Sequence, residues 1–148
     1  MRWLAIFLLM AAGVFFIDRA IKELFLQGFY YESRCITLGY VLNKGVAFSM
    51  LAFLGEWLKW ILLALIIALF AYLLRDGAIR RHPILFGILA GAAVGNLYDR
   101  FVYGGVIDYV YWHCGFDFAV FNFADVMIDL SVILLLYLHL QKGRVAQG

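Results

Sequence analysis

Charged residues are scarce in this chain. Only 15% of its 148 residues are Asp, Glu, Lys or Arg, whereas 66% are hydrophobic and 18% are aromatic. Ordinary soluble domains carry about 25% charged and about 45 to 50% apolar residues. The composition therefore excludes an ordinary soluble domain and indicates a membrane protein. Because a helix needs roughly 20 residues to cross a bilayer, the length allows about four spans.

Other scarcities narrow the function further. The 12 Lys and Arg residues never cluster densely, so no nucleic-acid partner is expected. The three histidines, His82, His113 and His139, are scattered, which argues against a metal site or a Ser-His-Asp arrangement. We therefore expect no metal and no cofactor. The only two cysteines, Cys35 and Cys114, are compatible with a disulfide or with two free thiols.

The fold class expected is a mainly α membrane protein, a four-helix transmembrane bundle with a small antiparallel β-sheet and loop cap on the outer face. Residues 1–148 are expected to form a single integral membrane domain. Its spans are predicted at about 3–26, 57–74, 83–98 and 124–141, its outer loops at about 27–56 and 99–123, and its cytosolic loop at 75–82. The N-terminal run also resembles a cleavable secretory signal, but no small-x-small cleavage site follows and "DRAIKE" continues with helical spacing, so we predict a first span.

The placement of charge predicts the orientation. Half of the basic residues lie in three short flanks, namely Arg2, Arg75, Arg80, Arg81, Lys142 and Arg144. The positive-inside rule places both termini and the middle loop in the cytosol. Nine of the ten acidic residues, all but Asp76, then lie in or beside the outer connections. Polar chemistry is therefore expected at the outer face of the membrane.

The outer connections have the composition of strands and turns. "ITLGYVLNKGVAFSM" and "GVIDYVYWHCGFDFAVFNF" are rich in Val, Ile, Tyr and Phe and are interrupted by glycines, which predicts a small sheet. Aromatic rings in the second connection are expected at the level of the lipid head groups: Tyr109, Tyr111, Trp112, Phe116, Phe118, Phe121 and Phe123.

The third span combines a packing face with a polar end. Gly87, Gly91 and Gly95 are four residues apart, a spacing that lets two helix backbones approach closely. One turn later, Asn96 and Arg100 could hold a peptide carbonyl or a head group. Asp99 is expected to have a structural role at the helix end. Asp18 and Lys22, four residues apart at the end of the first span, are likewise expected to form a structural ion pair or a helix-end cap.

Two carboxylates suggest hydrolytic chemistry. Asp108 and Asp125 are 17 residues apart and are joined by a segment that turns around Gly115. If both reach one pocket, like-charge repulsion and partial burial leave a proton shared between them. One carboxyl can then activate a water while the other donates a proton, which is amide hydrolysis without a metal. Asp129, one turn beyond Asp125, is expected to be a buried, hydrogen-bonded or protonated neighbour.

Four strings in register resemble the lipoprotein signal peptidases, also called signal peptidase II: "NKGVAFS", "GNLYDR", "GGVIDY" and "FNFAD". The resemblance covers nearly the whole chain. It implies an aspartic endopeptidase of the bacterial inner membrane that cleaves prolipoproteins before a cysteine carrying diacylglycerol. The outer face is then the periplasmic face. The implied catalytic pair is Asp108 and Asp125. Substrate-binding residues are implied at Asn43, Gly45, Asn96, Arg100 and Asn122, and supporting positions at Asp18, Lys22 and Asp99.

The implied substrate predicts the form of the site. We expect the helices to surround a groove open to membrane lipids, with the first outer loop, including Asn43 and Phe48, covering the peptide as a lid. A small proton-coupled carrier is the alternative, because intramembrane carboxylates also bind and release protons. A carrier requires carboxylates near the bilayer midplane, whereas Asp108 and Asp125 are predicted at one face. A purely structural scaffold would leave the outer polar residues without a purpose.

Overall fold

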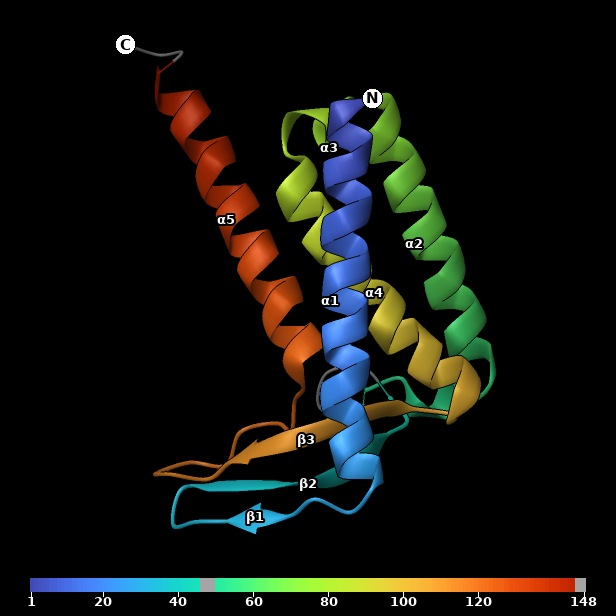
Figure 1. Cartoon of the computed structure of the whole chain (residues 1–148), viewed down its shortest axis with the longest axis vertical. Helices are drawn as coiled ribbons and strands as arrows, with labels where there is room; N and C mark the ends of the chain where they lie inside the picture. The colour runs from blue at the N-terminus through green and yellow to red at the C-terminus, as the bar shows by residue number, and fades with distance from the viewer. Residues whose placement is uncertain (46–49, 146–148) are drawn as a thin grey trace.

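The computed structural model describes residues 1–45 and 50–145. Four long helices run roughly side by side and a small sheet lies at one end of them (Figure 1). The helices are α1 (Arg2–Leu26), α2 (Trp57–Arg75), the short α3 (Ala78–Arg81), α4 (Pro83–Val102) and α5 (Phe123–Val145), with a 3-10 turn, η2, at Ala52–Leu54. The strands are β1 (Tyr31–Glu32), β2 (Ile36–Asn43) and β3 (Val106–Trp112).

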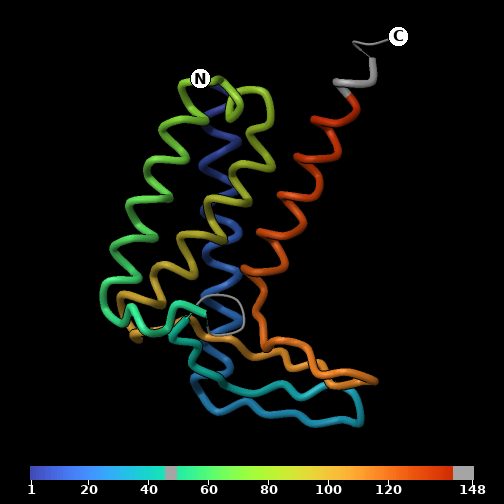
Figure 2. Tube along the Cα trace, turned by 180° about the vertical axis from the view of Figure 1, so that it is seen from behind, coloured from blue at the N-terminus to red at the C-terminus, as the bar shows by residue number. Residues whose placement is uncertain are grey.

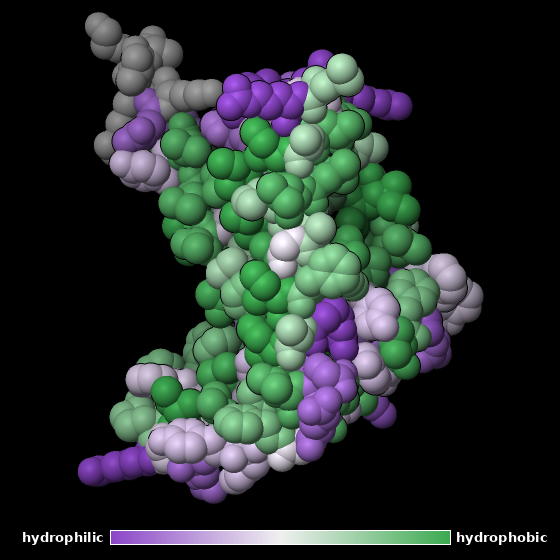
Figure 3. All heavy atoms as spheres, in the orientation of Figure 1, coloured by the Kyte–Doolittle hydropathy of each residue, from purple (hydrophilic) through white to green (hydrophobic). Residues whose placement is uncertain are grey.

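The long helices have the length and composition of membrane spans. All four qualify as candidate spans, and their surfaces are apolar between two polar ends (Figure 3). Helix α4 is the most enclosed, with 39% of its most apolar stretch buried against 6 to 11% in the other three. It contacts α1, α2 and α5. The predicted fold class, four membrane helices with a small antiparallel sheet, is confirmed.

A row of glycines lets α4 lie against α1. A side chain at Gly87 would place its Cβ 2.6 Å from the Phe7 carbonyl oxygen, and one at Gly91 would collide with the Ala11 backbone. At Gly95 the added Cβ would lie 2.7 Å from the Asp18 carboxylate. The predicted packing face therefore exists and its partner is α1. Close backbone contact of this kind holds helices together where lipid offers no hydrophobic driving force.

The sheet is antiparallel, in the order β1-β2-β3, and lies at the end of the bundle opposite the two termini (Figure 2). The pairing of β2 with β3 shifts by one residue midway. Leu38 pairs with Val110, but Val41 pairs with Asp108, so two residues of β2 oppose Tyr109 alone. Such a bulge changes which side chains share a face beyond it.

A disulfide joins Cys35 to Cys114, next to the end of the β2–β3 ladder at which Ile36 pairs with Trp112. The cysteines are 79 residues apart in sequence, with Cα atoms 4.3 Å apart. Beside them, the His113 amide donates a hydrogen bond to the Cys35 carbonyl. The disulfide therefore closes a loop that contains α2, α3 and α4 and fixes the sheet at its tip.

Reduction of this disulfide should destabilise the protein without removing its helices. A cross-link over a loop of this length restricts the unfolded chain, and its loss typically costs about 2 to 4 kcal/mol. We expect dithiothreitol to lower the apparent unfolding temperature in detergent, measured by circular dichroism, by several degrees. The double variant Cys35→Ser/Cys114→Ser should unfold at the reduced protein's temperature and should not respond to dithiothreitol. Equal unfolding temperatures for oxidised and reduced wild-type protein would contradict this.

Candidate functional site

A cavity of about 440 Å³ lies at the sheet end of the bundle. Helices α2, α4 and α5, strand β3, the end of β2 and residues 118–121 form its walls. Much of the lining is apolar, including Leu62, Ile66 and Ile128. Its polar lining consists of Asn43, Asn96, Arg100, Asp108, Asp125 and Asp129. A pocket that is mostly apolar with a few convergent polar groups is typical of a ligand site.

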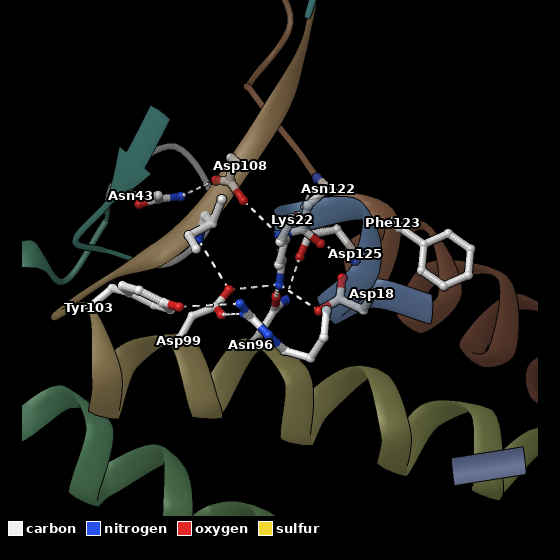
Figure 4. A network of polar contacts seen from close by, with 12 residues as sticks. Asp18, Lys22, Asn43, Asn96, Asp99, Tyr103, Asp108, Asn122, Phe123 and Asp125 are labelled. Carbon is white, nitrogen blue, oxygen red and sulfur yellow. Dashed lines mark hydrogen bonds and ion pairs between the residues drawn. The ribbon is translucent and has the colours of Figure 1, made fainter. Parts of the chain in front are cut away.

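Asp108 comes to the cavity on β3 and is held by two amides. Its Oδ2 accepts a hydrogen bond from Nδ2 of Asn43 at 3.0 Å, and its Oδ1 accepts one from Nδ2 of Asn122 at 2.7 Å (Figure 4). Only 2% of Asp108 is exposed. The carboxyl is therefore fixed in position by residues from β2 and from the start of α5.

The β2 bulge allows Asn43 to reach Asp108. Beyond the bulge, Val41 pairs with Asp108 and Asn43 pairs with Val106, so these four side chains share one face. If the ladder kept the register of Leu38 with Val110, Asn43 would lie on the opposite face from Asp108. The irregularity at Gly39 and Tyr40 thus determines one of the contacts of this carboxyl.

Asp125 is positioned by the first turn of α5. The Asp125 amide donates to Oδ1 of Asn122 at 2.9 Å, and the Asn122 amide donates to Oδ2 of Asp125 at 3.1 Å. This reciprocal pair is the capping-box arrangement, which satisfies two amides that a helix start leaves unpaired. Asn122 therefore contacts both carboxylates, Asp108 through its side chain and Asp125 through its backbone.

Asn96 orients the second oxygen of Asp125. Its Nδ2 donates to Oδ1 of Asp125 at 2.8 Å. Its own oxygen accepts from Nζ of Lys22 at 2.9 Å and from Nδ2 of Asn122 at 3.2 Å. Because both neighbours are donors, the amide oxygen must face them and the amide nitrogen must face Asp125.

Behind the cavity lies a buried ion-pair network on α1 and α4 (Figure 4). Nζ of Lys22 lies 2.7 Å from Asp18 and 2.7 Å from Asp99, and all three side chains are fully buried. Asp99 also pairs with Arg19 and accepts a hydrogen bond from the Ile107 amide at 3.2 Å. Since buried charges must be paired to be tolerated, each member depends on the others.

Burial changes the acidity of Asp108. It raises the pKa of this carboxyl from 3.8 to about 6, the Asn43 hydrogen bond opposes that rise, and the charge of Asp125 adds to it. A carboxyl with such a pKa can carry a proton near neutral pH. Two carboxyls in one cavity, at least one of them able to hold a proton, can supply an acid and a base.

Arg100 differs from the amides around it. It is 9% exposed and lines the cavity, where Asp108, Asp125 and Asp99 attract its charge. Within the described parts of the chain, no hydrogen bond or ion pair engages its guanidinium. It therefore has donors free for a ligand in the cavity. Among residues 1–45 and 50–145, no three His, Cys, Asp or Glu side chains form a group that could hold a metal ion.

The structure brings most of the predicted site residues together. Asn43, Asn96, Arg100, Asp108 and Asp125 line the cavity, and Asn122 lies fully buried beside it. The Gly45 amide donates to the Asn43 side chain at 3.0 Å. Asp18, Lys22 and Asp99 form the network behind the cavity. Phe48, predicted in a lid, lies outside the described residues.

Asp129 departs from its expected environment. The sequence predicts a buried, hydrogen-bonded or protonated neighbour of Asp125; the predicted burial is wrong, because Asp129 is exposed and lines the cavity. The reason is geometric, because four residues make slightly more than one helical turn and place Asp129 on the same cavity-facing side as Asp125.

Sequence reasoning also misses two contributors to the site. Tyr109, expected among the head-group aromatics, is buried, with 5% of its surface exposed. Arg19, which pairs with Asp99, lies above the Tyr98 ring. The strand alternation around Asp108 places Tyr109 on the opposite face, a signal that could have separated it from the exposed aromatics.

Known proteins resemble this chain in sequence and in fold. Residues 10–141 match the family described as signal peptidase (SPase) II. The chain is 58% identical over 132 residues to the lipoprotein signal peptidase of Sulfurovum sp. (strain NBC37-1), covering 89% of this chain and 90% of that protein. It is 54% identical over 134 residues to that of Helicobacter pylori (strain P12), covering 87% and 85%. A solved structure described as a bacterial membrane enzyme matches in fold with a TM-score of 0.78 at 24% identity, covering 93% of this chain and 88% of the other.

Removing the cation of the buried network should strongly destabilise the protein. Lys22→Met would leave Asp18 and Asp99 without the ammonium that lies 2.7 Å from both. Breaking a buried pair in this way typically costs about 3 to 5 kcal/mol. Chemical unfolding in detergent micelles would measure the loss.

Lys59→Met provides the matched control. Lys59 pairs with Glu56, whose side chain is 77% exposed. The loss of this pair, in which the carboxylate lies in solvent, should change the free energy of unfolding by less than about 1 kcal/mol. Similar losses for the two variants would show that burial of the network contributes nothing.

Proposed function

The chain belongs to the signal peptidase II family, and we propose that it is an aspartic endopeptidase that removes signal peptides from prolipoproteins carrying a diacylglyceryl cysteine. In this proposal Asp108 and Asp125 are the catalytic pair, and cleavage occurs just before the lipidated cysteine. The observation that carries the proposal is the convergence of the two carboxyls on one cavity, with Asn122 in contact with both.

The pair acts as an acid and a base. Asp108, whose pKa is raised to about 6 by burial, is the member proposed to hold the shared proton. Asp125 then takes a proton from a water molecule, which attacks the scissile carbonyl carbon. Asp108 donates its proton to the developing oxyanion or to the leaving amine. The amides of Asn43, Asn96 and Asn122 keep both carboxyls in place during these transfers.

Substrate binding is proposed for the polar groups around the pair. Each of the three asparagine side chains, those of Asn43, Asn96 and Asn122, already donates one amide hydrogen to a carboxylate. Arg100, by contrast, has donors available in the cavity. Arg100 is therefore the proposed principal contact for a carbonyl of the peptide or of the lipid ester. Gly45 supports the first loop through the Asn43 side chain. The apolar lining of the cavity, including Leu62 and Ile66, suits the signal helix and membrane lipids.

The proposed orientation puts this site at the outer face of the bacterial inner membrane. The two termini and α3, with their basic flanks, lie at the opposite end of the molecule (Figure 1). By the positive-inside rule that end is cytosolic. The disulfide at the sheet end suits an oxidising compartment. We propose one integral membrane domain whose site meets substrates at the outer interface.

The carrier alternative is less well supported. A proton-coupled carrier needs carboxylates near the bilayer midplane, at a site that can open to either side. Asp108 lies in the sheet and Asp125 in the first turn of α5, so both are at one end of the bundle. Their position favours chemistry at an interface over transport.

Purified protein should release the signal peptide from a lipidated prolipoprotein, measured by gel mobility or mass spectrometry. Asp108→Asn and Asp125→Asn should each lower turnover by at least about 100-fold, because each removes a proton-transfer group. Asp117→Asn is the control, since Asp117 bonds Tyr111 outside the cavity and should retain turnover. Normal cleavage by either cavity variant would refute the catalytic pair. A substrate without the diacylglyceryl group should be cleaved poorly.

The pH dependence should reflect the proton held by Asp108. An acid with a pKa of about 6 loses its proton as pH rises through that value, so kcat/KM should fall on the alkaline side. Asn43 donates a hydrogen bond that stabilises the Asp108 carboxylate and so lowers its pKa. Asn43→Ala removes this hydrogen bond, so the pKa of Asp108 should rise. The alkaline limb should therefore move to higher pH in the variant. A limb that stays in place or moves to lower pH would contradict the role of Asn43.

A further inference from the structure

Tyr109 is the residue next to Asp108 on β3, and its side chain leaves the strand on the opposite face. It is buried, with 5% of its surface exposed. Its ring stacks on Phe25 of α1, with centroids 4.2 Å apart and planes 8° from parallel. The residue therefore connects the strand that carries Asp108 to the end of the first helix.

The hydroxyl of Tyr109 makes a second connection, to α5. It accepts a hydrogen bond of 2.9 Å from the backbone amide of Phe123, the first residue of that helix. The first amides of a helix have no partner within the helix. Here the Phe123 amide is satisfied by Tyr109, and the Asp125 amide by the Asn122 side chain.

We propose that the Tyr109 hydroxyl is a positioning group for the catalytic pair, acting through the first turn of α5. Consecutive residues of β3 then hold that turn from two sides: Asp108 accepts from the Asn122 side chain, and Tyr109 accepts from the Phe123 amide. Asp125 lies two residues beyond Phe123 in the same turn. Together with the backbone pairing of Val110 and Phe121, these contacts hold the two carboxyls at a fixed spacing.

The spacing matters because proton transfer depends on it. Loss of the hydroxyl would leave the Phe123 amide, in a partly buried first turn, without its acceptor. The turn could then shift, and a displacement of about 1 Å at a reacting group can cost about 100-fold in rate. Binding groups on other elements, such as Arg100 on α4, would keep their places. The effect should therefore appear in kcat and not in KM.

Tyr109→Phe tests this directly, because it keeps the ring that stacks on Phe25 and removes only the hydroxyl. With a lipidated prolipoprotein we expect kcat to fall roughly tenfold and KM to stay within about twofold. Tyr111→Phe is the matched control, two residues further along β3. It loses a hydroxyl that bonds Asp117 away from the cavity and should retain wild-type kcat. Wild-type kcat in Tyr109→Phe, or a loss shared equally by Tyr111→Phe, would overturn the inference.

Phe25→Leu separates positioning from stability. It removes the stacked ring and keeps the hydroxyl of Tyr109, so it should lower the unfolding temperature while kcat per folded molecule stays within about twofold. A tenfold loss of kcat in Phe25→Leu would show that general destabilisation accounts for the effect. The inference rests on the proposed peptidase function. Failure of wild-type protein to cleave would refute that function, whereas full kcat in Tyr109→Phe beside inactive Asp108→Asn would refute the positioning role alone.

Discussion

The rest of the site depends on the buried ion pairs that the Lys22 ammonium forms with two carboxylates. This ammonium lies between Asp18 and Asp99 with no exposure to solvent, and it also donates to the Asn96 oxygen. Through Asp99 the network reaches the Ile107 amide, immediately before Asp108. Through Asn96 it reaches the Asp125 carboxylate. One buried cation therefore orients neighbours of both catalytic candidates, although it contacts neither of them by a hydrogen bond or ion pair.

Such a network can exist only where the helices approach closely. The glycine row of α4 brings its backbone against α1, and Gly95 faces the Asp18 carboxylate directly. Low-dielectric surroundings make unpaired charges costly and paired ones rigid. Within a bilayer, close packing of α1 and α4 holds these helices together without a hydrophobic driving force. The same packing encloses the ion pairs. Fold stability and site geometry are consequences of one helix contact, and a bulky residue at Gly95 would disturb both.

The sequence predicted the architecture well because its signals are local. Long apolar runs, basic flanks and glycine spacing are each readable over a few turns, and they indicated four membrane helices and a small sheet. The convergence of Asp108 and Asp125 followed from a short excursion around Gly115, where the chain turns with a φ of +84°. Three features could not be predicted from the sequence: the β2 bulge, the cation shared by Asp18 and Asp99, and the contact of Tyr109 with the start of α5. Each depends on register or packing between segments that are distant in the sequence. The burial predicted for Asp129 was wrong for a related reason, since helical spacing gives the face on which a side chain lies but not what covers that face.

The hydrogen bonds around the cavity divide the polar residues into two kinds. The three asparagines are already bonded to the carboxylates, so their principal effect in the free protein is orientation. The Arg100 guanidinium, by contrast, has its hydrogen-bonding capacity directed at the cavity. A cation close to two carboxyls also limits how far the pair can retain its proton, because it favours their ionised forms. For Asp108, burial and the charge of Asp125 raise the pKa, whereas the hydrogen bonds from Asn43 and Asn122 and the charge of Lys22 lower it, and the result is a pKa of about 6. In the proposed mechanism, a substrate carbonyl that accepts a hydrogen bond from Arg100 would therefore be held in the same cavity as a carboxyl that can carry a proton near neutral pH.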